Sequence, residues 1–108
     1  MKTDKNQMLA HMVYFSLIDD SPQACQKIID SANELLTGLE GILFLGIGTL
    51  IPDLARPVNV RDFQVGIHVI FRDRAAHDAY QVHPKHQQFI ADNKANWKLA
   101  RVFDCSLL

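Results

Sequence analysis

The sequence LAHMVYFSL, residues 9–17, decides the fold because it predicts a β-strand with two apolar faces. Side chains alternate between the two faces of a strand. One face therefore carries His11, Val13 and Phe15, and the other carries Ala10, Met12 and Tyr14. A strand that is apolar on both faces belongs to a sheet that is covered on both sides.

The rest of the chain predicts the element order strand, helix, strand, strand, split helix, strand. The first helix begins at Ser21-Pro22, where a hydroxyl caps the first amides, and ends near Gly38 and Gly41. The later elements are a buried strand over 42–51 with a bulge or close approach at Gly46 and Gly48, a loop over 52–61, an alternating strand over 62–72, helices over 73–82 and from 84 to about 97, and a strand over 98–107. This order is the α+β, ferredoxin-like βαββαβ arrangement, with a four-stranded antiparallel sheet and helices on one face.

The sheet face away from the helices stays apolar in this arrangement. Met12 and Tyr14 point to it from the first strand, and Ile70 points to it from the strand over 62–72. In a monomer these side chains would form an exposed apolar patch, and a second copy of the chain is the simplest cover. The sequence therefore predicts a homodimer.

Composition limits the partners and the compartment. The 108 residues include 11 Lys and Arg against 12 Asp and Glu, a net charge of -1, which provides no basic field for nucleic acid. Residues 1–8 are a polar segment unlike a secretory signal, and no apolar run approaches the roughly 18 residues of a membrane span. Residues 9–108 are therefore expected to form one cytoplasmic domain.

The two cysteines are expected to be structural. Cys25 and Cys105 lack metal-site spacing and are expected to be reduced core residues.

The segment YQVHPKH, residues 80–86, places a phenol and two imidazoles within seven residues. Helical spacing predicts that Tyr80, His83 and His86 all turn toward the same buried side. A proton donor and a proton acceptor beside an apolar core are typical of a small-molecule site. His83 also precedes Pro84, a position that favours capping of the following helix.

Four segments together resemble the stress-responsive A/B barrel domain family, called Dabb. They are the first strand over 11–17, the strand over 62–65, the segment over 80–89 and the ending over 102–104, and the resemblance spans nearly the whole chain from Leu9. It implies a dimeric α+β barrel in which two four-stranded sheets meet back to back. It also implies a family in which most members have no known activity and are associated in plants with salt stress.

A plant polyketide cyclase of this family uses a His and Tyr pair to close an aromatic ring by aldol condensation. The resemblance matches Tyr80 and His86 to that pair, and His83 and His11 to two further histidines. The loop over 52–61 and the strand around Val65 are not similar to the cyclase, so the substrate does not transfer with the resemblance. The wider superfamily also includes cofactor-free monooxygenases and haem-degrading enzymes, and no motif assigns this chain to either.

Two functions remain open. In one, the protein binds a small apolar or aromatic molecule between helices and sheet. The enzyme version of this function is a cofactor-independent lyase or cyclase, in which His86 removes a proton and Tyr80 stabilises the oxyanion. In the other, it is a non-catalytic structural or stress-related interaction module, and His86 is a core histidine bonded to Asp104 or to a backbone carbonyl. The expected lining of the pocket is His11, Val13, Val65, Ile67, His83 and Phe89.

The chain contains five histidines, which raises the question of a metal. His83 and His86 are three residues apart, without a cysteine or a carboxylate in a recognised ligand pattern. His68 is expected to point away from the helices, toward the dimer seam. The sequence therefore predicts no metal site and no cofactor.

Overall fold

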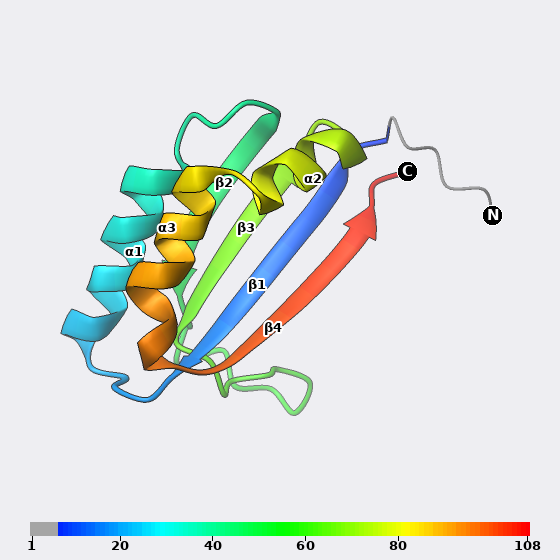
Figure 1. The fold of residues 1–108 in the computed structure, drawn as a ribbon. Helices are drawn as coiled ribbons and strands as arrows, with labels where there is room; N and C mark the ends of the chain where they lie inside the picture. Colours follow the sequence, from blue (N-terminus) through cyan, green and yellow to red (C-terminus); the bar gives the residue numbers. More distant parts are fainter. Residues whose placement is uncertain (1–6) are drawn as a thin grey trace.

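The computed structural model describes residues 7–108, so residues 1–6 of the polar segment lie outside the described residues. Within them, four strands and three α-helices follow the predicted ferredoxin-like order (Figure 1), and no helix is long and apolar enough to cross a membrane. The elements are β1 (Leu9–Leu17), α1 (Pro22–Leu36), β2 (Ile42–Thr49), β3 (Val65–Phe71), α2 (Arg74–Gln81), α3 (Pro84–Asn93), the 3-10 turn η1 (Lys94–Asn96) and β4 (Trp97–Ser106).

The four strands form one antiparallel sheet in the order β2-β3-β1-β4. The helices lie together on one side of this sheet, which we call the helix-covered face, and the opposite side is the open face (Figure 1). The register sets His11 of β1 opposite Val69 of β3 and opposite Asp104 of β4. Alternation turns these three side chains toward the helices and turns Met12 and His68 toward the open face.

Helix α1 forms as the sequence predicts and supplies much of the core. The Ser21 side chain caps it by accepting a hydrogen bond from the Ala24 amide at 3.2 Å. Its apolar stripe buries Ile28, Ala32 and Leu36 almost completely against the sheet. Burial of an Ile or Leu side chain stabilises a fold by about 1.5–3 kcal/mol, so this stripe holds α1 in place.

Strand β2 differs from the buried strand that the sequence predicts. It is an edge strand, and its side chains Leu43 and Phe44 are 58% and 56% exposed. The register shift lies between Ile42 and Phe44 and not at the glycines. Gly46 is instead a place of close approach, because a Cβ atom there would lie 2.9 Å from the Phe44 ring. An apolar run predicts that a strand is covered, but it does not say whether the cover comes from the same chain or from a second molecule.

Two expectations near the C-terminus also need correction. The helix predicted to reach about Trp97 ends at Asn93, and Trp97 is the first residue of β4 after the 3-10 turn. Both cysteines are free, as predicted, but only Cys25 is a core residue, since Cys105 is exposed. Cys105 stands opposite Ala10 on β4, so it belongs to the open face.

Gly41 sets the position of helix α2. Its φ angle is 86°, and a Cβ atom there would lie 2.4 Å from the Cβ atom of Ala76 in α2. The carbonyl of Gly41 also accepts a hydrogen bond from the amide of Arg72 at 2.8 Å, just before α2 begins. Only glycine combines this backbone angle with this approach. Because α2 carries Tyr80, the contact helps to place that ring over the sheet.

Candidate functional site

A cavity of about 180 Å³ lies between the helix-covered face and helices α2 and α3. Strands β1, β3 and β4 form its floor, and Trp97 and Gln81 are among its walls. Of the residues predicted for the pocket, the following line it: His11, Val13, Ile67, Tyr80, His86 and Phe89. The structure therefore brings these six side chains to one place.

Two predicted lining residues lie elsewhere. Val65 is 0% exposed and belongs to the core cluster, beyond the cavity on the same face of β3. His83 is half-buried and does not turn inward with Tyr80 and His86, so the prediction of one shared side is wrong for this ring. Its Nδ1 atom instead accepts a hydrogen bond from the Lys85 amide at 3.0 Å, which makes it the predicted cap of α3.

Tyr80 enters the cavity as a neutral phenol. It lies in the last turn of α2 and is 5% exposed. Burial raises its pKa well above the ordinary value for a tyrosine. No residue of the described chain hydrogen-bonds to the Tyr80 hydroxyl. A hydroxyl that keeps its proton and has no protein partner is a donor available to an oxygen of a bound molecule.

His86 is the matching acceptor. Its ring centroid lies 4.2 Å from that of Tyr80, and the residue is 9% exposed. Burial lowers the pKa of His86, against a smaller opposing effect of the Gln81 carbonyl, so the ring is neutral near pH 7. Nδ1 lies 3.3 Å from that carbonyl oxygen and must donate to it. Nε2 is then the nitrogen with a free lone pair.

The hydrogen bond to a backbone carbonyl is the one predicted for a core histidine, whereas Asp104 pairs with a different ring. Its Oδ1 atom lies 2.5 Å from Nδ1 of His11, across the β1–β4 pair. The His11 ring is 5% exposed and lies 6.1 Å from Tyr80, edge to face. His11 thus connects the buried cavity to a carboxylate that is 46% exposed.

Sequence reasoning missed His77, whose ring packs 5.4 Å from His11 and 5.5 Å from Phe71. Apolar spacing in α2 favours Ala75 and Ala79 for the inner side together with Tyr80, but both alanines are exposed. The buried side is instead made by Ala76, half-buried His77 and Tyr80. His77 lies three residues before Tyr80, a spacing that predicts the same face of the helix. Its polar ring was not counted as part of an apolar stripe.

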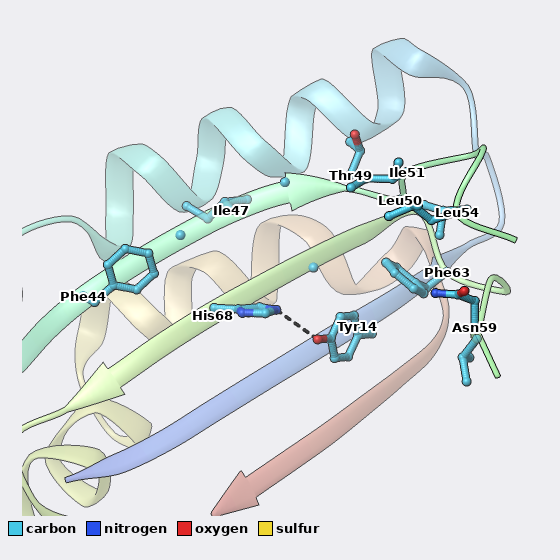
Figure 2. Close-up of a pocket in the computed structure, with 14 residues that line it drawn as sticks. Tyr14, Phe44, Ile47, Thr49, Leu50, Ile51, Leu54, Asn59, Phe63 and His68 are labelled. Carbon is cyan, nitrogen blue, oxygen red and sulfur yellow. Dashed lines mark hydrogen bonds between the residues drawn. The ribbon is translucent and has the colours of Figure 1, made fainter. Parts of the chain in front are cut away.

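The open face has its own hollow, of about 460 Å³ (Figure 2). Strands β2 and β3 and the loop before β3 border it, and Phe44 and Phe63 are part of its lining. Tyr14 and His68 meet there, with a hydrogen bond of 2.9 Å between the phenol oxygen and Nε2. His68 therefore points away from the helices, as predicted, and its partner is on the neighbouring strand.

Comparisons with known proteins find a matching family and solved structures with a similar fold. A family model described as Stress Responsive A/B Barrel Domain matches residues 9–107. A Dabb family protein with a ferredoxin-like fold from Mesorhizobium loti superposes with a TM-score of 0.78 at 24% identity, covering 94% of this chain and 98% of that one.

Two further structures share the fold. A dimeric ferredoxin-like protein of unknown function from Thermobifida fusca gives a TM-score of 0.80 at 17% identity, with 99% and 97% of the two chains covered. A hydroxynitrile lyase from Passiflora edulis gives 0.76 at 17% identity, with 95% of each chain covered. The comparison with curated proteins found no significant match.

Proposed function

The chain belongs to the stress-responsive A/B barrel domain (Dabb) family, and we propose that it binds a small aromatic or apolar molecule beside Tyr80 and His86. The observation that carries this proposal is a neutral donor and a neutral acceptor on the wall of one cavity, with ring centroids 4.2 Å apart. A purely structural pair would satisfy its polar atoms within the protein, and the Tyr80 hydroxyl has no such partner in the described chain.

The size of the cavity favours a ligand of about one ring. Sites for drug-sized ligands occupy about 300–1,000 Å³. The cavity here is about 180 Å³, close to the roughly 150 Å³ that encloses a benzene molecule. Val13, Ile67 and Phe89 make its surface largely apolar, so a single aromatic ring with one oxygen substituent fits both the space and the two polar rings.

The same pair supports acid–base chemistry without a cofactor. Nε2 of His86 removes a proton from the bound molecule, and the Tyr80 hydroxyl donates a hydrogen bond to the oxygen on which negative charge develops. This is the chemistry of a lyase or of an aldol-type cyclase. The neighbour from Passiflora edulis is a lyase by name, but at 17% identity it supports the fold and leaves this activity as our proposal.

The test uses phenol, benzaldehyde and acetophenone as probes, with 2-naphthol as an oversized control. Ligand-observed NMR should detect binding of the one-ring probes to the wild-type protein and much weaker binding of 2-naphthol. Tyr80→Phe should weaken the probes by about 3- to 10-fold, the value of one hydrogen bond of 0.5–1.5 kcal/mol. Tyr14→Phe is the matched control, since its phenol lies on the open face.

If no one-ring probe binds, or if Tyr14→Phe weakens binding as much as Tyr80→Phe, the pocket is not a ligand site. His86→Gln and His86→Ala then separate binding from a structural role. A ligand site predicts lost binding in a folded protein. An interaction module with a structural His86 predicts lost stability, by about 1–3 kcal/mol for an unsatisfied buried partner.

We further propose that two copies of the chain pair through their open faces. Supporting this, Phe44 and Phe103 are 56% and 59% exposed there, next to half-buried Met12 and Ile70. The Thermobifida fusca neighbour with the same fold is described as dimeric. A stable pair of this kind buries on the order of 1,500 Å² or more in total. The hollow beside Tyr14 and His68 would then lie at the seam between the two sheets.

We also place the protein in the cytoplasm, without a nucleic-acid or membrane partner. Both cysteines are free, which suits a reducing compartment. The net charge of -1 gives no electrostatic attraction to a phosphate backbone. Localisation of a tagged copy of the chain in cell fractions is the direct check.

A further inference from the structure

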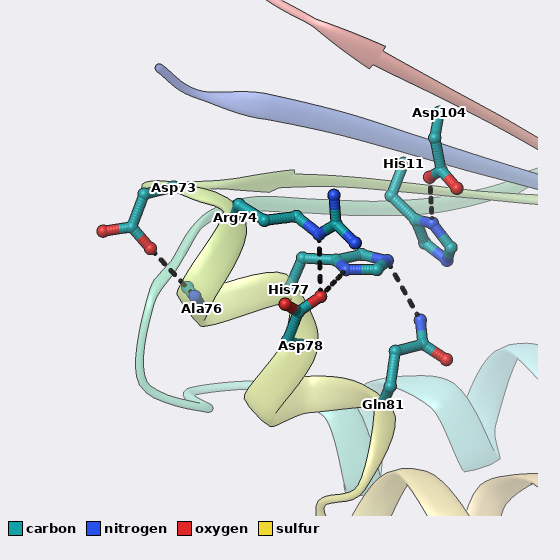
Figure 3. A network of polar contacts seen from close by, with 8 residues as sticks. All are labelled: His11, Asp73, Arg74, Ala76, His77, Asp78, Gln81 and Asp104. Carbon is teal, nitrogen blue, oxygen red and sulfur yellow. Dashed lines mark hydrogen bonds and ion pairs between the residues drawn. The ribbon is translucent and has the colours of Figure 1, made fainter. Parts of the chain in front are cut away.

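Three groups that bind metals in other proteins meet where β1, β4 and α2 come together (Figure 3). His11 is supplied by β1, Asp104 by β4 and His77 by α2. One ligand atom from each residue lies within 4.8 Å of the other two. We propose that His11, His77 and Asp104 bind one divalent first-row transition metal ion, with Zn²⁺ as the best fit.

The two strand residues are held side by side by the sheet itself. His11 and Asp104 are opposite partners in the β1–β4 register, and Nδ1 of His11 lies 2.5 Å from Oδ1 of Asp104. A contact this short between these atoms requires a proton between them, because a lone pair would otherwise face a carboxylate. A metal ion would take the place of that proton, which moves to Nε2 of the ring or to solvent.

The third group is oriented toward this pair by its own hydrogen bonds. Nδ1 of His77 lies 2.9 Å from Oδ1 of Asp78, which in turn accepts a hydrogen bond from Arg74 at 2.9 Å (Figure 3). Because Nδ1 donates to Asp78, Nε2 of His77 carries the lone pair. A carboxylate behind a histidine in this way fixes ring orientation and raises basicity at metal centres. Nε2 lies 3.4 Å from the Gln81 amide nitrogen, a long contact that a metal ion can replace.

Small side-chain movements complete the geometry. A tetrahedral ion with bonds of about 2.0–2.1 Å keeps its ligand atoms about 3.4 Å apart, so the widest pair must close by more than 1 Å. The Asp104 side chain is 46% exposed and is free to rotate, whereas the His11 side chain is 7% exposed and held by its neighbours. The fixed ligand lies on the central strand, and the adjustable ligand lies at the edge.

The ligand type favours Zn²⁺ over Mg²⁺ or Ca²⁺, and nearby charges favour a cation. Two imidazoles and one carboxylate suit Zn²⁺, Co²⁺ and Ni²⁺, whereas Mg²⁺ and Ca²⁺ require oxygen ligands. Asp104 and Asp78 provide two negative charges near the ion, and the guanidinium of Arg74, which is paired with Asp78, offsets one of them. Three protein ligands leave a fourth position for water or a small anion.

The sequence prediction of no metal considered His83 and His86, which are not members of this cluster. The proposed ion goes beyond the proposed ligand site and does not depend on it. The two share His11, which lines the cavity, but His77 and Asp104 do not line it. A variant that loses metal binding because His77 is replaced should therefore still bind the one-ring probes beside Tyr80 and His86.

The experiment uses the full chain without a polyhistidine tag, after dialysis against a chelator. Co²⁺ is titrated as the visible-band probe, Zn²⁺ is titrated by calorimetry, and thermal melts are recorded with and without Zn²⁺. One ion per chain, a tetrahedral Co²⁺ spectrum and a Zn²⁺-dependent rise in melting temperature are the expected results. His77→Gln and Asp104→Asn should abolish the spectrum, and Asp78→Asn should weaken binding by about 10- to 100-fold.

The matched control is His83→Asn, which removes a histidine outside the cluster and keeps a side chain able to cap α3. It should bind Co²⁺ like the wild-type protein. Circular dichroism verifies that each variant is folded. The proposal is overturned if wild-type protein and folded His77→Gln bind the ion equally, if His83→Asn alone loses it, or if neither Co²⁺ nor Zn²⁺ binds at micromolar concentration.

Discussion

The two faces of the sheet are built from the same strands and are both apolar, yet they end in different environments. On the helix-covered face, Phe71 and Val69 are 0% exposed, and the one-ring cavity lies between the sheet and helices α2 and α3. On the open face, Phe103 and Phe44 remain more than half exposed around a wider hollow. An apolar alternation pattern therefore predicts that a sheet face is covered, but it does not say what covers it. The helices of this chain cover only one of the two faces.

The most severe test of this comparison substitutes one phenylalanine on each face. Phe71→Ala should lower the free energy of unfolding by about 3–5 kcal/mol at any protein concentration, because it leaves a hole in a filled core. Phe103→Ala should lower the free energy of unfolding by less, and its loss should shrink as the protein is diluted, because dissociated chains no longer gain stability from pairing. Urea unfolding at two protein concentrations measures both. Equal, concentration-independent losses would contradict the distinction between the faces.

A charge on the open face gives the next largest effect. Met12→Asp should weaken self-association at least about a hundredfold, since an unpaired buried charge costs several kcal/mol and each 1.4 kcal/mol is a factor of ten. Sedimentation equilibrium measures the change. Val58→Asp is the control, because Val58 is 79% exposed in the loop before β3. A Met12→Asp protein that remains dimeric would place the interface elsewhere on the molecule.

The two tyrosines offer a matched pair with a smaller effect. Tyr14→Phe removes the hydrogen bond to His68 on the open face and should lower stability by about 0.5–1.5 kcal/mol. Tyr80→Phe removes a hydroxyl with no partner in the described chain, so unfolding should change little while probe binding weakens. Thermal melts with and without phenol record both quantities. A larger loss of stability for Tyr80→Phe would assign that hydroxyl a structural role.

The smallest expected effect is a slope of stability with pH from the helix-covered face. Burial holds the pKa of His86 below its ordinary value of 6.5, so the unfolded chain binds more protons than the folded one just under that pH. Stability should therefore fall as pH drops through 6.5 toward the folded pKa, and His86 should contribute no slope above it. Urea unfolding between about pH 5 and 8 should show a shallower slope for His86→Gln than for His83→Asn. Identical slopes in the two variants would refute this source.

The sequence predicts the fold well because each element has a local signal. Ser21-Pro22 starts α1, Asp73 accepts a hydrogen bond from Ala76 at the start of α2, and the alternation in β1 separates the faces. Most of the cavity could also be predicted, since Tyr80 and His86 follow helical spacing. These signals lie within a few residues of the feature that they specify.

The remainder depends on contacts between distant segments. His11 and Asp104 are 93 residues apart in sequence, and only the strand register shows that they are partners. His77 was missed because a polar residue interrupts the apolar stripe of α2. Val65 was assigned to the pocket because it shares a strand face with Ile67, but core side chains fill the space around Val65. Local periodicity gives the direction of a side chain, but it does not say whether the space above that side chain is open or filled.

The strand order also sets a hierarchy of motion. β1 and β3 lie in the middle of the sheet, where both edges of each strand are paired, and β2 and β4 lie outside. Amide hydrogens of the inner strands should exchange with solvent slowest, because their release requires opening from both sides. His11 thus sits in the most persistent part of the molecule, whereas Asp104 is carried by a strand that opens earlier. Access to the buried imidazole from solvent should therefore follow the fraying of β4, on the timescale of local unfolding rather than of side-chain rotation.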